Sequence, residues 1–182
     1  ITFTGETRTG EAIMQNAAIG GRDVSFELGG KNPAIVFADC DMDKAIEGTM
    51  RSAFANCGQV CLGTERVYVE RSIFDEFVAR LKEGAEGLVC GRPENDETSM
   101  GPLISKEHQE KVLGYYLRAA EQGANVITGG GAPELGDDLR DGAWVEPTIW
   151  TGLPDDSDVI ADEIFGPCCH VRPFDDEDEV VR

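Results

Sequence analysis

Two cysteines, Cys57 and Cys61, lie four residues apart in a glycine-flanked stretch, 54–66, that follows a run with helical periodicity. A cysteine thiolate is a good nucleophile toward a carbonyl carbon, and a helix N-terminus or other nearby dipoles can lower the pKa of the thiol enough to supply it. The intervening Gly58 and Gln59 favour a loop over a continuous helix, which weakens any argument from helical spacing. Spacing alone leaves three interpretations open: a nucleophile at Cys61, a redox pair, or buried thiols without a chemical role.

A carboxylate elsewhere in the chain could act on the product of such a nucleophile. Glu27 lies in a short alternating strand pattern, 24–28, and is followed by Gly29 and Gly30, which let another backbone or a ligand approach closely. Taken by itself, Glu27 is interpreted as a solvated carboxylate at the end of a strand. A general base is the alternative.

A glycine near the start of the chain could help to bind an anion. Gly5 joins the strand-like residues 1–3 to a helical pattern over 7–18. A helix N-terminus after a glycine turn presents unpaired N–H groups and a positive dipole end to a phosphate. The stretch lacks the Lys-Ser/Thr ending of a P-loop, so an ordinary strand-to-helix turn is the alternative to a phosphate site.

The charge balance argues against nucleic acid as a partner. The 182 residues contain 35 Asp and Glu against 16 Lys and Arg, a net charge of -19, whereas phosphate backbones are bound by clustered basic residues. No apolar run approaches the roughly 20 residues of a membrane helix, and no signal peptide is evident. We therefore expect a cytoplasmic protein that binds no membrane.

The cysteine and histidine content predicts no metal site. Six cysteines and two histidines are present, and none of the cysteines forms the C-x2-C pair typical of a structural zinc site. We expect reduced thiols, as is usual inside cells. His108 falls in the first turn of a predicted helix, where a surface role is expected rather than a catalytic one.

Strand patterns alternate with helical patterns over most of the chain, which predicts an α/β fold with an open, twisted, mostly parallel sheet and flanking helices. The segment 144–150 contains Pro147 and is interpreted as an edge strand, and 155–162 as an acidic linker. Strands are expected at 1–3, 24–28, 34–38, 67–69, 125–128, 144–150 and 168–174, and helices over 7–18 and starting at Asp41, Ser72, Ser105 and about residue 175.

Four motifs, in order along the chain, resemble the signatures of the aldehyde dehydrogenase superfamily. They are FTGxTxxG from Phe3, ELGGKNP from Glu27, FxNxGQxC from Phe54 and EIFGP from Glu163, and the separation of 34 residues between Glu27 and Cys61 also suits that family. The resemblance implies an aldehyde dehydrogenase-like catalytic domain, incomplete at both ends. It also implies NAD as cofactor and a small-molecule aldehyde that is oxidised to its carboxylic acid.

The resemblance also implies roles for single residues. Cys61 would attack the aldehyde and pass through a thiohemiacetal to a thioester, its backbone N–H forming half of an oxyanion hole, and Glu27 would activate the water that hydrolyses the thioester. A carboxylate at Glu6 departs from the serine common in the family and would repel the pyrophosphate. The implied cofactor-binding residues are Gly5 and Glu6 at the pyrophosphate, Leu28 at the carboxamide, Glu163 at the nicotinamide ribose and Phe165 near the ring.

A finer resemblance joins the chain to the branch of this family that oxidises muconic semialdehydes, which are ring-cleavage products of catechol degradation. It rests on FTGETRTG at 3–10 and CLGTER at 61–66. Another semialdehyde or betaine aldehyde as substrate stays open, as does a non-catalytic redox-sensing relative that uses Cys57 and Cys61. Arg66 is either a clamp for an acidic substrate or, as we expect, a structural arginine that closes the loop.

Within that family, residues 1–26 would be the last strand-helix unit of the dinucleotide-binding domain, and 27–182 a catalytic domain truncated at its C-terminal end. The other NAD-binding loops, and the asparagine that completes the oxyanion hole, would then precede residue 1. We expect this segment alone to bind NAD poorly and to turn over little, which saturable micromolar NAD binding would contradict. The complete protein is expected to be a homodimer or homotetramer.

Overall fold

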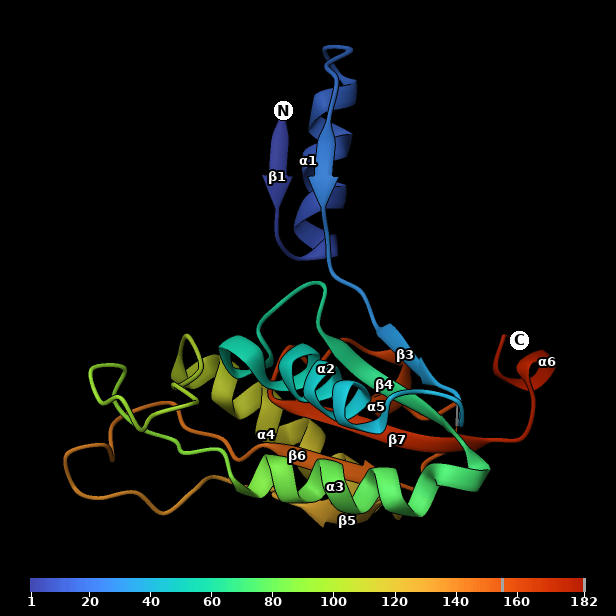
Figure 1. Ribbon diagram of the computed structural model, residues 1–182. Helices are drawn as coiled ribbons and strands as arrows, with labels where there is room; N and C mark the ends of the chain where they lie inside the picture. Colours follow the sequence, from blue (N-terminus) through green and yellow to red (C-terminus); the bar gives the residue numbers. More distant parts are fainter. Residues whose placement is uncertain (155, 182) are drawn as a thin grey trace. The chain divides into compact units, whose positions relative to one another are not determined.

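The computed structural model describes residues 1–154 and 156–181, and the chain divides into two compact units, Ile1–Gly30 and Lys31–Arg182. Figure 1 labels most of the helices and strands of both units. Asp155, at the start of the predicted acidic linker, and Arg182 lie outside the described residues.

The first unit is a strand-helix-strand motif. It consists of β1 (Thr2–Thr4), α1 (Thr7–Ala18) and β2 (Ser25–Glu27), and its two strands pair in parallel with Phe3 opposite Phe26. The two rings meet edge to face with centroids 6.3 Å apart. The helix over 7–18 is confirmed at both of its predicted ends. β1 is shifted by one residue from the predicted strand 1–3, and β2 lies within the predicted strand 24–28.

The second unit is built on a five-stranded sheet in the order β3-β4-β7-β6-β5. The pairs β3–β4, β4–β7 and β7–β6 are parallel, whereas β5 is antiparallel to β6. The mostly parallel α/β sheet is therefore confirmed. Its strands are β3 (Asn32–Val36), β4 (Thr64–Glu70), β5 (Asn125–Thr128), β6 (Thr148–Thr151) and β7 (Cys168–Phe174).

Helices cover both faces of this sheet. One apolar core lies between the sheet and the pair α2 (Met42–Phe54) and α3 (Phe74–Glu86), and a second lies between the sheet and the pair α4 (Lys106–Glu121) and α5 (Asp158–Ala161). Successive strand residues point to opposite faces, so Cys169 belongs to the first core and Cys168 to the second. Short helices η1 (Ala55–Gly58), η2 (Arg71–Ile73) and α6 (Glu177–Val180) complete the unit.

Three predicted features of the second unit were wrong. Ser72 does not cap a helix: it lies in η2 and its hydroxyl donates to Glu70, while α3 begins two residues later at Phe74. β6 is an inner strand, and Pro147 immediately precedes it, so the proline removes no hydrogen bond from the ladder. The acidic segment contains α5, which the Ser157 hydroxyl caps by accepting from the Val159 N–H.

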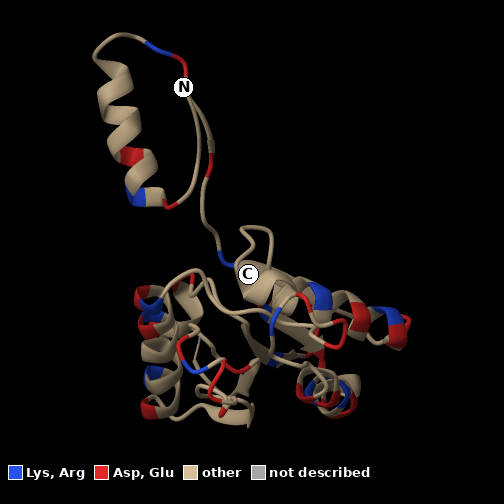
Figure 2. Ribbon diagram, turned by 90° about the vertical axis from the view of Figure 1, so that its left-hand side faces the viewer, with Lys and Arg blue, Asp and Glu red and all other residues tan. Residues whose placement is uncertain are grey.

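Acidic and basic residues are interspersed along the helices of the second unit, as the ribbon colours of Figure 2 show. Their ion pairs lie mostly at the surface, where solvent screening makes each worth little. Within residues 1–154 and 156–181, the pair between Lys31 and Glu65 is the one with both side chains only 9% exposed. No described helix combines the length and the apolar character that a membrane crossing requires.

Candidate active site

Cys61 lies in a tight turn between α2 with its short extension η1 and the strand β4. The Gly63 N–H donates to the Val60 carbonyl at 2.7 Å and closes the turn around Cys61, whose side chain is partly buried. From the start of β3, the Asn32 side-chain amide donates to the carbonyl of Cys61 at 2.7 Å and to that of Gly63 at 3.2 Å. Two neighbouring strands therefore fix the backbone that carries the thiol.

The residues just before this turn adopt a left-handed backbone. Asn56, Cys57 and Gly58 have φ values of 51°, 56° and 69°, a conformation that costs free energy at the two non-glycine positions. Asn56 Nδ2 donates to the Gln59 carbonyl at 3.0 Å, and Gln59 Nε2 donates to the Asn56 carbonyl at 3.3 Å. Gln59 Oε1 also accepts from the Ile104 N–H at 3.0 Å. The Asn and Gln of the motif thus hold a strained loop, as is common at functional sites.

The other cysteine of the loop is poorly suited to thiolate chemistry. Cys57 is 3% exposed, and its burial raises the pKa of the thiol to about 12, so it stays protonated at neutral pH. Burial likewise raises the pKa of Cys169 to about 12 and that of Cys168 well above its ordinary value. These differences in exposure favour Cys61 as the nucleophile over a redox pair.

Cys61 does not lie at a helix N-terminus, one of the two environments that could lower the pKa of a cysteine thiol. No described helix begins at Cys61: β4 follows at Thr64, and α2 and η1 end before the turn. Among the described residues, the peptide dipoles nearest to Cys61 along the sequence belong to its own turn and to the C-terminal end of η1.

The segment from Glu163 to Phe165 is held by contacts to its backbone. The Glu65 carboxylate, from β4, accepts from the Ile164 N–H at 3.1 Å and from the Phe165 N–H at 2.9 Å. Phe165 has a φ of 62°, a left-handed conformation rare for an aromatic residue. His108 Nε2 lies 2.7 Å from the Phe165 carbonyl, and because a carbonyl only accepts, this nitrogen carries the hydrogen. His108 is half-buried, in contrast to the exposed position that we expected.

The cysteine loop touches the segment after Phe165. A Cβ atom at Gly58 would lie 2.0 Å from the Gly166 carbonyl oxygen, so only glycine fits this crossing. The 54–66 stretch and the EIFGP motif, about a hundred residues apart in sequence, are therefore packed backbone to backbone within one unit.

Gly58→Ala is expected to lower the free energy of unfolding of the complete enzyme by at least about 2 kcal/mol, because the added methyl group meets a backbone carbonyl and φ is 69°. Gly114→Ala is the matched control: Gly114 lies within α4 with open space at its Cβ, and alanine there is expected to add about 0.5–1 kcal/mol. Denaturant unfolding measures both, and equal effects at the two sites would contradict the tight crossing.

The predicted residues of the first unit form a second group. Glu27 is exposed at the end of β2, and its carbonyl accepts from the Gly5 N–H at 3.0 Å. A Cβ at Gly5 would lie 2.7 Å from the Phe3 ring, and one at Gly10 would lie 2.8 Å from the Leu28 side chain. Packing inside this unit therefore accounts for both glycines, and it fixes Leu28 against α1.

The carboxylate of Glu6 lies beside Arg8 rather than over the end of α1. Glu6 Oε2 is 3.7 Å from Arg8 Nη2, and in the described unit the Glu6 side chain makes no capping hydrogen bond to the helix. The first turn of α1 is thus left without a side-chain cap at its positive dipole end, which fits a phosphate group.

Arg66 has a structural contact. Its Nε donates to the Lys31 carbonyl at 2.9 Å and joins β4 to the start of β3. This contact supports the structural interpretation of Arg66. Within the described residues, no group of three or more His, Cys, Asp or Glu side chains could hold a metal ion.

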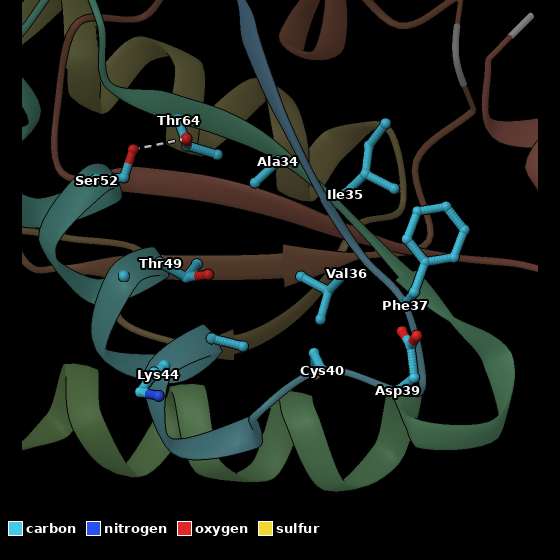
Figure 3. Close-up of a pocket in the computed structure, with 12 residues that line it drawn as sticks. Ala34, Ile35, Val36, Phe37, Asp39, Cys40, Lys44, Thr49, Ser52 and Thr64 are labelled. Carbon is cyan, nitrogen blue, oxygen red and sulfur yellow. Dashed lines mark hydrogen bonds between the residues drawn. The ribbon is translucent and has the colours of Figure 1, made fainter.

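A cavity of about 420 Å³ lies between β3 and α2 and contains none of the predicted site residues. Figure 3 shows its mixed lining, with Cys40, Lys44 and the pair Ser52–Thr64. The two hydroxyl oxygens of that pair are 2.7 Å apart and satisfy one another.

Sequence reasoning missed the residues that hold the site together. Asn32 fixes the Cys61 turn, Lys31 pairs with Glu65, and Glu65 and His108 hold Phe165. Lys31 and Asn32 lie inside the ELGGKNP motif, which could have indicated a role for both. Glu65 stands in an otherwise strand-forming run, where a charged residue facing inward could have been suspected.

Known proteins resemble this chain over its whole length. The aldehyde dehydrogenase family model matches residues 1–182. The chain is 70% identical over 182 residues to 2-hydroxymuconic semialdehyde dehydrogenase of Pseudomonas sp. (strain CF600), and 46% identical over 182 residues to betaine aldehyde dehydrogenase of Vibrio vulnificus (strain YJ016). Each match extends over 100% of this chain and 37% of the relative, so the chain spans little more than a third of the length of these relatives.

Solved structures of this family superpose on nearly the whole chain. Betaine aldehyde dehydrogenase from Staphylococcus aureus in complex with NAD+ gives a TM-score of 0.94 at 37% identity, over 99% of this chain and 35% of that one. An NAD+ complex of aldehyde dehydrogenase from Bacillus cereus gives 0.93 at 39% identity, over 99% of this chain and 36% of that one. The chain therefore belongs to the aldehyde dehydrogenase family.

Proposed function

We propose that the enzyme containing this chain oxidises 2-hydroxymuconic semialdehyde to its carboxylic acid with NAD as cofactor. The observation that carries the proposal is a partly exposed thiol, Cys61, in a strained loop packed against the EIFGP segment. The identity of 70% to a dehydrogenase of this substrate supports the choice of aldehyde.

In the proposed mechanism, the Cys61 thiolate adds to the aldehyde carbon. The new C–S bond gives a thiohemiacetal whose oxyanion is stabilised by the Cys61 backbone N–H. NAD supplies, when bound, the acceptor for the hydride whose departure turns the thiohemiacetal into a thioester. Glu163, Phe165, Leu28 and the Gly5 turn would hold it.

Glu27 completes the cycle as general base. Its carboxylate removes a proton from a water molecule as the water oxygen bonds to the thioester carbon. The C–S bond then breaks, the carboxylic acid leaves, Cys61 returns to the thiolate, and Glu27 releases its proton to solvent. We also propose a cytoplasmic homodimer or homotetramer as the working form.

The substrate is tested by assaying the complete enzyme against 2-hydroxymuconic semialdehyde, betaine aldehyde and succinic semialdehyde. We expect kcat/KM to favour the first by at least about tenfold, a difference of about 1.4 kcal/mol in transition-state binding. A preference for betaine aldehyde would replace the proposed substrate but keep the reaction.

A redox-sensing role is the competing class of function. It requires a reversible bond between Cys57 and Cys61, and the high pKa of the buried Cys57 disfavours the thiolate exchange that would form it. Peptide mass mapping after mild oxidation distinguishes the two, since a sensor gives this crosslink readily. Its formation without loss of aldehyde oxidation would count against the nucleophile.

A further inference from the structure

We propose that Glu65, supported by Lys31, is a positioning residue that sets the 163–165 segment for cofactor binding and couples it to the Cys61 turn. The inference rests on the proposed function, because the segment binds the nicotinamide ribose in that scheme. Its observations are independent of it, since they concern only contacts inside the second unit.

Glu65 holds two consecutive backbone groups with one carboxylate. Oε2 accepts from the Ile164 N–H at 3.1 Å, and Oε1 accepts from the Phe165 N–H at 2.9 Å. Glu65 is 8% exposed, so both bonds lie away from solvent, where a charge-assisted hydrogen bond is strongest. A carboxylate is the one side chain of this length with two acceptor oxygens and no donor.

The conformation that these bonds hold is unfavourable by itself. Phe165 has a φ of 62°, and such strain persists where the surroundings over-determine it. Both of its backbone polar groups are fixed, the N–H by Glu65 and the carbonyl by His108 at 2.7 Å. The backbone that directly follows Glu163 is therefore held by contacts from β4 and α4.

Lys31 offsets the free-energy cost of burying the Glu65 carboxylate. Its Nζ bonds to Glu65 Oε2, and both side chains are 9% exposed. A buried charge without its partner is strongly destabilising, so the lysine is needed where the carboxylate is.

Lys31 and its neighbour Asn32 also connect this segment to the Cys61 turn. Asn32, next to Lys31, donates to the Cys61 carbonyl at 2.7 Å, while Lys31 bonds to the carboxylate that holds the 163–165 segment. The start of β3 thus sets the thiol and the ribose-binding segment in register. Loss of Glu65 is expected to disturb the segment more than the thiol, because Asn32 remains.

Glu65→Gln in the complete enzyme tests the proposal. Glutamine keeps one acceptor oxygen and replaces the other by an NH2 group, which cannot accept from the second N–H. We expect KM for NAD to rise at least about tenfold, the effect of one lost charge-assisted hydrogen bond, with ester hydrolysis in the absence of NAD changed less than about threefold. Hydrogen–deuterium exchange in the peptide containing Ile164 and Phe165 should accelerate by a similar factor.

The double variant Lys31→Met/Glu65→Gln separates positioning from stability. It removes the unpaired lysine charge left by the single change, so the melting temperature should recover at least half of its loss. KM for NAD and the amide exchange should stay raised. Asp43→Asn is the matched control, since it breaks the exposed ion pair with Arg80 on the helices α2 and α3 and should leave all these measurements unchanged.

Two results would overturn the proposal: unchanged exchange and KM in Glu65→Gln, or recovery of KM and exchange together with stability in the double variant. Failure of the proposed function is a separate outcome. If the unmodified enzyme oxidises no aldehyde with NAD, the exchange of the Ile164–Phe165 peptide still decides whether Glu65 holds this segment.

Discussion

Replacing Cys61 by alanine in the complete enzyme is expected to remove both aldehyde oxidation and ester hydrolysis, lowering kcat for each by at least about 10⁴-fold. The reason is that, in the proposed mechanism, both reactions begin with the formation of the same C–S bond. The turn that carries residue 61 is held through its backbone, by Asn32 and by the Gly63 N–H, so the side chain can be removed without releasing the turn. Steady-state NADH formation and p-nitrophenyl acetate hydrolysis measure the two activities.

Cys40→Ala is the control for a general loss of a thiol. Cys40 lines the cavity of Figure 3, which contains none of the predicted site residues, and its replacement should leave both activities within about twofold. Survival of either activity in Cys61→Ala would disprove the assignment of the nucleophile.

Glu27→Gln is expected to slow turnover by about 10²–10⁴-fold while leaving acylation intact, because the amide cannot take a proton from water. Acyl-enzyme should therefore accumulate. Rapid mixing should show a burst of about one NADH per active site, followed by a slow steady rate, and intact-protein mass spectrometry should show the added acyl group.

The matched control for this change is Glu11→Gln, another exposed glutamate of the first unit, on α1. It removes the same charge from the same unit and should leave the steady rate unchanged. Fast turnover without a burst in Glu27→Gln would point to a different base.

Local features of the fold were predictable from the sequence. The bounds of α1, the caps Asp41 and Ser105, and β7 over 168–174 follow from side chains within a few residues, which act over the range that periodicity and capping describe. The prediction that Ser72 caps a helix was wrong, because its hydroxyl donates to Glu70 instead and α3 starts after Ile73.

Features that depend on distant segments were not predictable. The inner position of β6 is decided by its pairing with β7 on one side and β5 on the other, which no local pattern records. Glu65 is a similar case, since its partners lie 99 and 100 residues along the chain. The roles of Cys61 and Glu27 stay predictions, for which the structure supplies positions but no reaction.

The long separation in sequence between Glu65 and its backbone partners also determines the order in which these segments are synthesised. During synthesis the Cys61 turn leaves the ribosome about a hundred residues before Ile164 and Phe165, at roughly 5–20 residues per second. For those seconds the Glu65 carboxylate lacks the Ile164 and Phe165 N–H groups, and Gly58 lacks the Gly166 backbone that it packs against. The Cys61 turn is thus made early, and the EIFGP segment packs against its loop late, when β7 enters the sheet beside β4.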